Sequence, residues 1–276
     1  MAGLELTGFE GRVAVVTGAG RMRSIGRCIA VELAKAGADV VITGTGRPPE
    51  RYPDDEKEAG WRDIASVAEE IEATGQRALP LVSDVSNPEA VQELLATILE
   101  EFGRIDFVVN NAAFARGPDR MPAVEIPIDV WQRVIDVNLN GTFYMSHYFG
   151  QRLIEQGAGG AIVNISSVAG KRLSVNASAY ASSKAGIHAL TGCMAGEMGR
   201  YNIRVNTICP GTVDTFRMDD IPRGQIWDER VAAGTPLGRA SDGSDIAWMT
   251  VYLCSDQGNW ITGQSINVDG GAVVQH

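Results

Sequence analysis

The sequence of 276 residues contains few of the side chains that hold metals or disulfides. Its four cysteines, Cys28, Cys193, Cys209 and Cys254, are far apart and have no CxxC spacing, and its three histidines lack the spacing of metal ligands. We therefore expect free thiols in a reducing compartment, no disulfide set and no metal site.

Long hydrophobic runs are also absent. No apolar run approaches the ~18 residues of a membrane-spanning helix, and residues 1–12 lack the charged-then-apolar pattern of a signal peptide. We expect a cytoplasmic protein without a membrane segment. A basic stripe is missing too, and the formal net charge is −10, which argues against a nucleic-acid partner.

The sequence does contain a regular alternation of two patterns. Short apolar runs rich in β-branched residues alternate with longer segments whose apolar residues recur at helical spacing. The predicted strands are 13–17, 39–43, 77–82, 105–109, 161–167, 203–208 and 265–268, and the predicted helices are 24–36, 61–74, 87–102, 129–155, 179–201 and 241–255. Residues 44–60, with three prolines, are predicted to be a loop, and residues 212–235 a lid of short helices over a cleft.

This alternation predicts an α/β protein with a single-domain, Rossmann-type, doubly wound parallel seven-stranded sheet and helices on both faces. We expect one domain over residues 1–276, with 1–110 mainly the dinucleotide-binding half and 111–276 the catalytic half. In such folds the ligand lies at the carboxyl ends of the strands, near the switch in strand order.

Polar or glycine-rich clusters follow five of the predicted strands. Thr17-Gly18 leads into Ser24-Ile25-Gly26 at the start of a helix, where unpaired N–H groups favour a phosphate; a tight structural turn is the alternative. The other four clusters are Asp84, Asn111, Ser167 and Pro210-Gly211. Because all five fall on one edge of one sheet, they predict a ligand site there.

Tyr180 and Lys184 are one helical turn apart on the same face. A cation beside a phenol lowers the tyrosine pKa and makes it a usable acid and base near neutral pH, although such a pair is common on helix surfaces. Ser167 lies thirteen residues upstream, at the end of a strand. Asn138 lies mid-helix among apolar residues, either as a hydrogen-bonded core group or as a side chain that reaches a site.

Together these motifs resemble the short-chain dehydrogenase/reductase family from Gly11 to Gly271. The quoted motifs are Thr17-Gly18 with Ser24-Ile25-Gly26, Asp84-Val85, Asn110-Asn111-Ala112-Ala113, Asn138, Ser166-Ser167, Tyr180-Ala-Ser-Ser-Lys184, Pro210-Gly211-Thr-Val-Asp-Thr215 and Asn267-Val-Asp-Gly-Gly271. The resemblance implies that Tyr180 is the acid/base, that Lys184 lowers its pKa and holds the nicotinamide ribose, that Ser167 polarises the substrate oxygen, and that Asn138 supports a proton-relay water. It also implies a homotetramer, or a dimer, built on residues 129–155, 179–201 and the last strand.

The same resemblance implies the residues that bind the cofactor. Asp84-Val85 would line the adenine, Asn111-Ala112 the ribose, and Val213 and Thr215 the carboxamide. The full predicted set is Gly18, Arg23, Ser24, Ile25, Gly26, Arg47, Asp84, Val85, Asn111, Ala112, Tyr180, Lys184, Pro210, Gly211, Val213 and Thr215.

Two departures from the family pattern bear on the chemistry. The lengthened glycine loop with Ser24 resembles divergent enoyl-carrier-protein reductases, but those have a longer tyrosine–lysine spacing, so we predict carbonyl chemistry. No acid follows the second strand, where Gly44 and Thr45 stand, while Arg21, Arg23 and Arg47 are near in sequence. NADP(H) is therefore preferred over NAD; the alternative is that these arginines face solvent.

The predicted function is NAD(P)-dependent interconversion of a secondary alcohol and a ketone by hydride transfer, with a small-molecule alcohol or ketone as substrate. Substrate contacts are expected from Phe114, Arg116, Lys171, Arg172, Leu173, Asn176 and Phe216. Lys171 and Arg172 either bind an acidic substrate or are solvated. The alternatives are a 3-oxoacyl-type ketoreductase, weakened because the loop 156–160 lacks an arginine, and a non-catalytic nucleotide sensor on the same fold.

Overall fold

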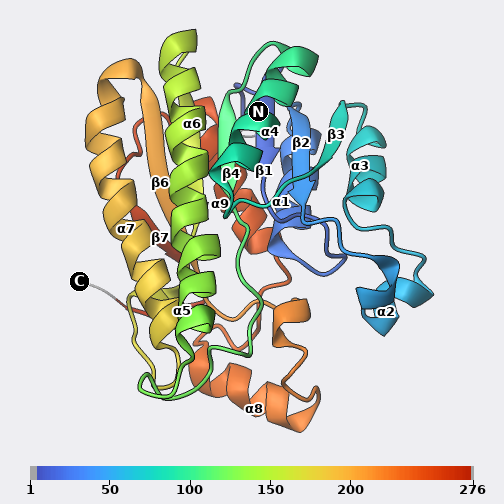
Figure 1. Cartoon of the computed structure of the whole chain (residues 1–276), viewed down its shortest axis with the longest axis vertical. Coiled ribbons are helices and arrows are strands. Elements are labelled where there is room, and N and C mark those ends of the chain that lie inside the picture. Colours follow the sequence, from blue (N-terminus) through green and yellow to red (C-terminus); the bar gives the residue numbers. More distant parts are fainter. Residues whose placement is uncertain (1–4, 275–276) are drawn as a thin grey trace.

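A parallel sheet runs through the centre of the computed structural model, which describes residues 5–274 (Figure 1). Within this range the sheet has seven strands in the order β3-β2-β1-β4-β5-β6-β7, and every pairing is parallel. The strands are β1 (Val13–Val16), β2 (Asp39–Gly44), β3 (Ala78–Val82), β4 (Phe107–Asn110), β5 (Gly160–Ile165), β6 (Ile203–Pro210) and β7 (Ser265–Val268). The strand order reverses between β1 and β4, which is the switch point where ligands bind in such sheets.

Helices cover both faces of the sheet. One face carries α1 (Ile25–Lys35), α3 (Ile64–Glu72) and α9 (Ser244–Cys254), and the other carries α4 (Pro88–Phe102), α6 (Gly141–Gln156) and α7 (Ser178–Met198). Each side buries its own apolar cluster against the sheet. The predicted doubly wound fold is confirmed. None of the helices among residues 5–274 has the length and apolar character needed to cross a membrane.

Local sequence signals set the helix ends. The Ser24 side chain accepts a hydrogen bond from the backbone N–H of Arg27 and so caps α1, and Asn87 caps α4 in the same way through Ala90. Pro88 occupies the first turn of α4, and Gly103, with φ of +73°, ends that helix in the left-handed conformation.

The predicted helix 129–155 is helical along its whole length, but a π turn interrupts its α-helical pattern. Helix α5 (Ile128–Ile135) is followed by the π turn Asp136–Asn140 and then by α6. The side chain of Asn138 bonds to two partners outside its own helix, accepting from the backbone N–H of Phe114 (2.8 Å) and donating to Ser183 Oγ (3.0 Å). A π turn adds one residue to the helical turn and is frequent at functional sites.

Other boundaries also differ from the prediction, two of them near the site. The predicted loop 44–60 contains a 3-10 turn (Pro49–Arg51) and α2 (Asp54–Glu58), whose first turn holds three acids that favour a helix N-terminus. Strand β5 ends at Ile165, so Ser166 and Ser167 lie beyond it.

The predicted lid 212–235 does contain short helices, a 3-10 turn (Phe216–Met218) and α8 (Gln225–Gly234). In Figure 1, α2 and α8 both lie toward the lower end, where the strands finish.

Candidate active site

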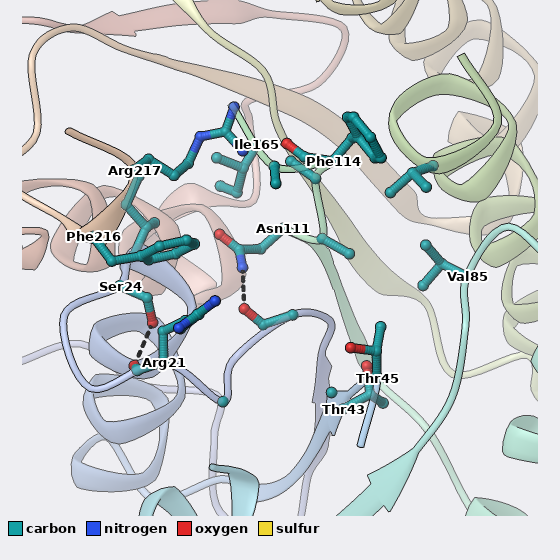
Figure 2. Close-up of a pocket in the computed structure, with 18 of the residues that line it drawn as sticks. Arg21, Ser24, Thr43, Thr45, Val85, Asn111, Phe114, Ile165, Phe216 and Arg217 are labelled. Atoms are coloured by element: carbon teal, nitrogen blue, oxygen red, sulfur yellow. Dashed lines mark hydrogen bonds between the residues drawn. The ribbon is translucent and has the colours of Figure 1, made fainter. Parts of the chain in front are cut away.

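A first cleft of about 530 Å³ opens along the carboxyl ends of β1 to β5. Its lining includes eleven residues of the predicted cofactor set: Gly18, Ser24, Ile25, Arg47, Asp84, Val85, Asn111, Ala112, Tyr180, Lys184 and Thr215. In Figure 2, Asn111 lies near the turn that carries Arg21 and Ser24, and Val85 lies on the opposite side of the cleft. These residues come from elements far apart in sequence, and the parallel sheet brings them to one edge.

Close backbone packing explains two glycines of the turn after β1. Gly18 has φ of +69°, and a Cβ there would lie 2.8 Å from the Cα of Ala112. A Cβ on Gly26 would lie 2.5 Å from Asn111 Nδ2, which donates to the carbonyl oxygens of Thr17 and Gly18 (2.8 and 3.0 Å). The first turn of α1 contains no acid, so its free N–H groups suit an anion. The turn therefore fits the phosphates of a dinucleotide.

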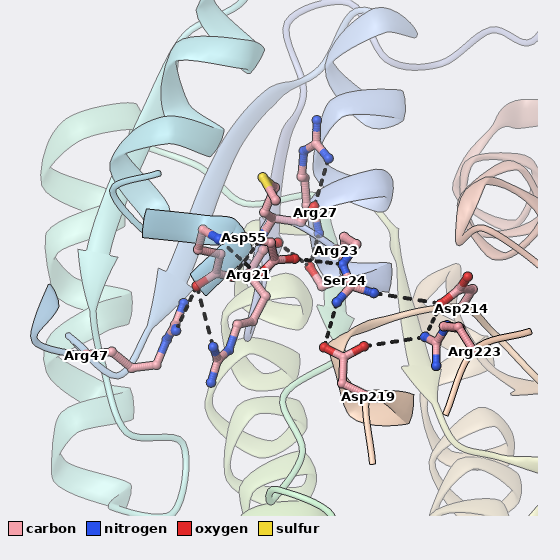
Figure 3. Close-up of polar contacts among 11 residues, drawn as sticks. Arg21, Arg23, Ser24, Arg27, Arg47, Asp55, Asp214, Asp219 and Arg223 are labelled. Atoms are coloured by element: carbon pink, nitrogen blue, oxygen red, sulfur yellow. Dashed lines mark hydrogen bonds and ion pairs between the residues drawn. The ribbon is translucent and has the colours of Figure 1, made fainter. Parts of the chain in front are cut away.

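A network of ion pairs surrounds the far end of this cleft (Figure 3). The buried carboxylate of Glu56, which is 1% exposed, pairs with Arg47 (3.1 Å) and Arg21 (3.5 Å). Arg47 also lies 3.3 Å from the carboxylate of Asp63, a buried residue that lines the cleft. The arginines that favoured NADP in the sequence are therefore balanced by carboxylates here.

Arg23 belongs to a separate set of ion pairs and does not line the first cleft. It bonds to Asp219 (2.6 Å) and Asp55 (2.9 Å), and it lies 3.7 Å from Asp214. The bonds to Asp219 and Asp55 raise the pKa of Arg23. Because Asp55 is in α2 and Asp219 follows the 3-10 turn of the lid, Arg23 joins the two segments that frame the cleft.

Tyr180 and Lys184 lie on the first turns of α7 and face the cleft. Lys184 is 3% exposed, donates to the carbonyl oxygen of Ile165 (2.8 Å), and lies 5.7 Å from the centre of the Tyr180 ring. Burial by itself would raise the pKa of Tyr180, but the charges of Lys184 and Arg217, with a hydrogen bond to Ser167, outweigh it and lower that pKa. The phenol is thereby a stronger acid than an ordinary tyrosine, which suits a role as proton donor and acceptor.

Two neighbouring serines follow β5, and their surroundings differ. Ser166 is buried, and its hydroxyl is engaged with the carbonyl oxygen of Lys184 (2.9 Å) and with His188 Nε2 (2.8 Å). Ser167 is partly exposed and caps a short turn by accepting from the backbone N–H of Ala169 (3.1 Å). The Ser166 hydroxyl is thus used within the fold, whereas Ser167 faces Tyr180.

A second cleft of about 490 Å³ adjoins the first, and Tyr180, Ser166, Ile25, Thr215 and Arg217 line both. Four arginines line it, Arg116, Arg120, Arg217 and Arg230, and none of its lining residues within 5–274 is an aspartate or glutamate. Arg120 and Arg217 lie over the Tyr180 ring, with guanidinium carbons 4.6 and 5.6 Å from its centre.

The predicted residues divide between the two clefts, and some lie outside both. Phe114 and Phe216 line the first cleft, while Ser167, Asn176, Pro210, Gly211 and Val213 line the second. Neither lining contains Gly26, Arg23, Asn138, Lys171, Arg172 or Leu173. Lys171 donates to Asn267 Oδ1 (2.6 Å) and to the carbonyl oxygen of Ser265, so its ammonium group is used by the fold.

Several lining residues were missed from the sequence, among them Asp63, Arg120, Arg217 and Arg230. Asp63 precedes α3 with an unusual φ of +56°, and nothing in the local pattern marks it. The arginines had a weak signal, because they fall in the two segments, 114–127 and 212–235, expected to frame the substrate. No set of three His, Cys, Asp or Glu side chains grouped for a metal ion occurs within residues 5–274.

A doubly wound parallel sheet whose switch point opens on a glycine-rich turn defines the dinucleotide-binding class of α/β proteins. A family model described as Enoyl-(Acyl carrier protein) reductase matches residues 18–273. A short-chain dehydrogenase/reductase of Aspergillus oryzae is 39% identical, with 95% of each chain covered. An L-rhamnose 1-dehydrogenase (NAD(P)(+)) of Sphingomonas sp. is 36% identical, covering 96% of this chain and 98% of the relative. The chain belongs to the short-chain dehydrogenase/reductase family.

A solved structure agrees with this assignment. Carveol dehydrogenase from Mycobacterium avium, in complex with NAD, matches with a TM-score of 0.87 at 29% identity, covering 96% of this chain and 99% of that chain. The family predicted from the motifs is therefore confirmed.

Proposed function

We propose that this protein is an NAD(P)-dependent dehydrogenase that interconverts a secondary alcohol and a ketone, with Tyr180 as acid and base. The observation that carries the proposal is that Tyr180 lines both clefts. A dinucleotide in the first cleft and a substrate in the second would meet at its phenol. Relatives named as rhamnose and carveol dehydrogenases support this reaction class.

The bound nicotinamide would supply or accept the hydride, and the protein supplies position and a proton. Tyr180 would give its phenolic proton to the substrate oxygen during reduction and take it back during oxidation. Lys184 favours the phenolate through its charge, and its place beside Tyr180 on the cleft wall suits a contact with the nicotinamide ribose. Ser167, on the second-cleft side of Tyr180, is suited to donate a hydrogen bond to the substrate oxygen.

Asn138 has a structural setting that suits support of this site. Its side chain joins the loop after β4 to α7 through Phe114 and Ser183. The predicted water relay to Lys184 stays a proposal, as do the homotetramer or dimer and the cytoplasmic location.

A substrate and cofactor screen tests the proposal directly. Wild-type protein and Tyr180→Phe would be mixed with NAD or NADP and a panel of secondary alcohols and sugars, or with NADH or NADPH and a panel of ketones, and the nicotinamide absorbance followed. We expect turnover by wild type and a loss of about 10²- to 10⁴-fold in Tyr180→Phe. Normal turnover in Tyr180→Phe would overturn its role as acid and base.

The same screen, extended to enoyl and 3-oxoacyl thioesters with NADH or NADPH, separates the alternative functions. An enoyl thioester reduced in preference to any ketone would favour the chemistry in the description of the family model. A 3-oxoacyl thioester reduced in preference to sugars would favour the ketoreductase. Cofactor binding with no turnover across the panel would favour the nucleotide sensor.

For the cofactor we propose NAD rather than NADP, against the preference inferred from the sequence. A 2′-phosphate at the ribose end would meet the carboxylate of Asp63 as well as Arg47, whose charge is already balanced by Glu56. A ribose hydroxyl can both donate to a carboxylate and accept from a guanidinium, whereas a phosphate only accepts. Dissociation constants for NADH and NADPH, measured by fluorescence, test this. Tighter binding of NADPH would overturn it.

A further inference from the structure

The second cleft carries a charge opposite to that of the whole protein. The chain has a formal net charge of −10, yet among residues 5–274 four arginines and no acid line this cleft. We propose that the substrate bears an oxyanionic group, a carboxylate or a phosphate ester, which Arg120 and Arg230 bind beside Tyr180. Only the reacting end of that substrate rests on the proposed function; the anion site rests on the arginines themselves.

Arg120 is the centre of the argument because its guanidinium is poorly satisfied. It is partly buried, and its side chain makes no hydrogen bond with any residue among 5–274; the Asp119 carboxylate lies 3.7 Å from its Nε. Burial lowers the pKa of Arg120, against the raising effect of Asp119. Because its Nε is buried without a hydrogen-bond partner, this guanidinium gains from an anion that enters the cleft.

The other three arginines add charge to the same cleft. Arg230, on α8, is exposed and has no ion-pair partner among the described residues. Arg217 donates to the carbonyl oxygen of Phe114, which leaves its charge unneutralised. Arg116 does pair with Asp220, but that carboxylate is 57% exposed, so water screens the pair.

The position of these charges limits the size of the substrate. The guanidinium carbon of Arg120 lies 4.6 Å from the centre of the Tyr180 ring. An oxyanion bound to Arg120 therefore lies only a few bonds from the substrate oxygen that Tyr180 would serve. Short hydroxy acids, keto acids and small phosphorylated alcohols fit this separation. A guanidinium also binds such oxyanions through two parallel hydrogen bonds.

Direct binding tests the anion site without any turnover. Malonate and inorganic phosphate would be titrated by calorimetry into wild type, Arg120→Gln, Arg230→Gln and the matched control Arg200→Gln. Arg200 is an exposed arginine at the other end of α7, outside both clefts. We expect one anion to bind wild type and Arg200→Gln equally, and about 10- to 100-fold more weakly to Arg120→Gln.

The variants also distinguish this site from the phosphate-binding turn of the first cleft, because Arg120 and Arg230 do not line that cleft. Stronger binding of malonate than of phosphate would identify the oxyanion as a carboxylate, and the reverse a phosphate. Equal binding of both anions by all four proteins, or no binding by wild type, would overturn the proposal.

Matched substrates link the anion site to turnover. Short hydroxy acids, their primary amides and their phosphorylated counterparts would be compared by kcat/KM in wild type and Arg120→Gln. We expect wild type to prefer the anionic member and the ratio of kcat/KM for the acid to that for the amide to fall in the variant; the ratio is compared because Arg120 also lies over the Tyr180 ring. Turnover of amides and acids alike would refute the inference and leave the proposed function standing. Arginine-dependent anion binding without turnover of any substrate would support the anion site and count against the proposed function.

Discussion

In the first cleft, Arg21 and Arg47 share the buried carboxylate of Glu56, whereas in the second cleft Arg120 and Arg230 have no comparable partner. The two clefts meet at Tyr180, so paired arginines lie on one side of this side chain and poorly paired arginines on the other. An arginine that is already neutralised positions loops, while an arginine that is not has charge left for a ligand. The number of arginines near a site is therefore a poor guide to ligand charge unless their partners are known.

The largest effect should come from replacing Lys184, because its proposed role is in the reaction and not in binding the substrate anion. Lys184→Met removes the positive charge beside Tyr180, so the pKa of the phenol rises and the phenolate is lost. Turnover should fall by about 10²- to 10⁴-fold. Methionine fills the buried space, so the folded state should persist in circular dichroism. Turnover near that of wild type would refute the role of Lys184.

Glu56→Gln should make the first cleft resemble the second. It leaves Arg21 and Arg47 partly buried without their shared carboxylate, which should destabilise the protein by about 2–4 kcal/mol in thermal or urea unfolding. The released charge should also shift relative binding from NADH toward NADPH. Glu69→Gln is the matched control, because Glu69 pairs only with the exposed Arg62. An unchanged NADH/NADPH ratio would contradict the balance that we infer.

Arg217→Gln should change the pH dependence of alcohol oxidation more than it changes the affinity for malonate or phosphate. Arg217 helps to lower the pKa of Tyr180, so its removal raises that pKa. Alcohol oxidation needs the deprotonated phenol, and its rate rises as the pH passes through the tyrosine pKa. The ascending limb of the pH–rate profile should therefore move to higher pH. A profile that stays in place would show that the charge of Arg217 does not reach the phenol.

Arg116→Gln should have the smallest effect. Its charge is already paired with the exposed Asp220, so the variant should lose less than about 1 kcal/mol of stability. Its affinity for malonate or phosphate should fall less than that of Arg120→Gln. An equal fall in both variants would mean that pairing does not decide which arginine is available.

The fold was predictable because its elements are marked locally. Runs such as Val13–Val16 and capping residues such as Ser24 and Asn87 define the strands and helix starts before any tertiary contact is known. The π turn was not predictable in this way. It accompanies the hydrogen bonds that the Asn138 side chain accepts from Phe114 and donates to Ser183, and both partners come from other parts of the chain.

The candidate site was predictable where motifs carry it and not where charge pairing decides it. Tyr180, Lys184 and the glycines near Gly18 stand in recognisable spacing. The partners of the arginines do not, since Glu56 and Asp63 reach Arg47 only after the segment 44–63 folds back over the cleft. From the sequence alone, the same arginines therefore favoured a 2′-phosphate.

Because Tyr180, Thr215 and Arg217 line both clefts, we expect a ligand bound in one cleft to change the affinity of the other cleft for its ligand. A ligand that changes the field at Tyr180 from one side changes the affinity for the ligand on the other side. Thermodynamic linkage requires this effect to be mutual. A dinucleotide that tightens the hold on an anion must itself be held more tightly once that anion is bound.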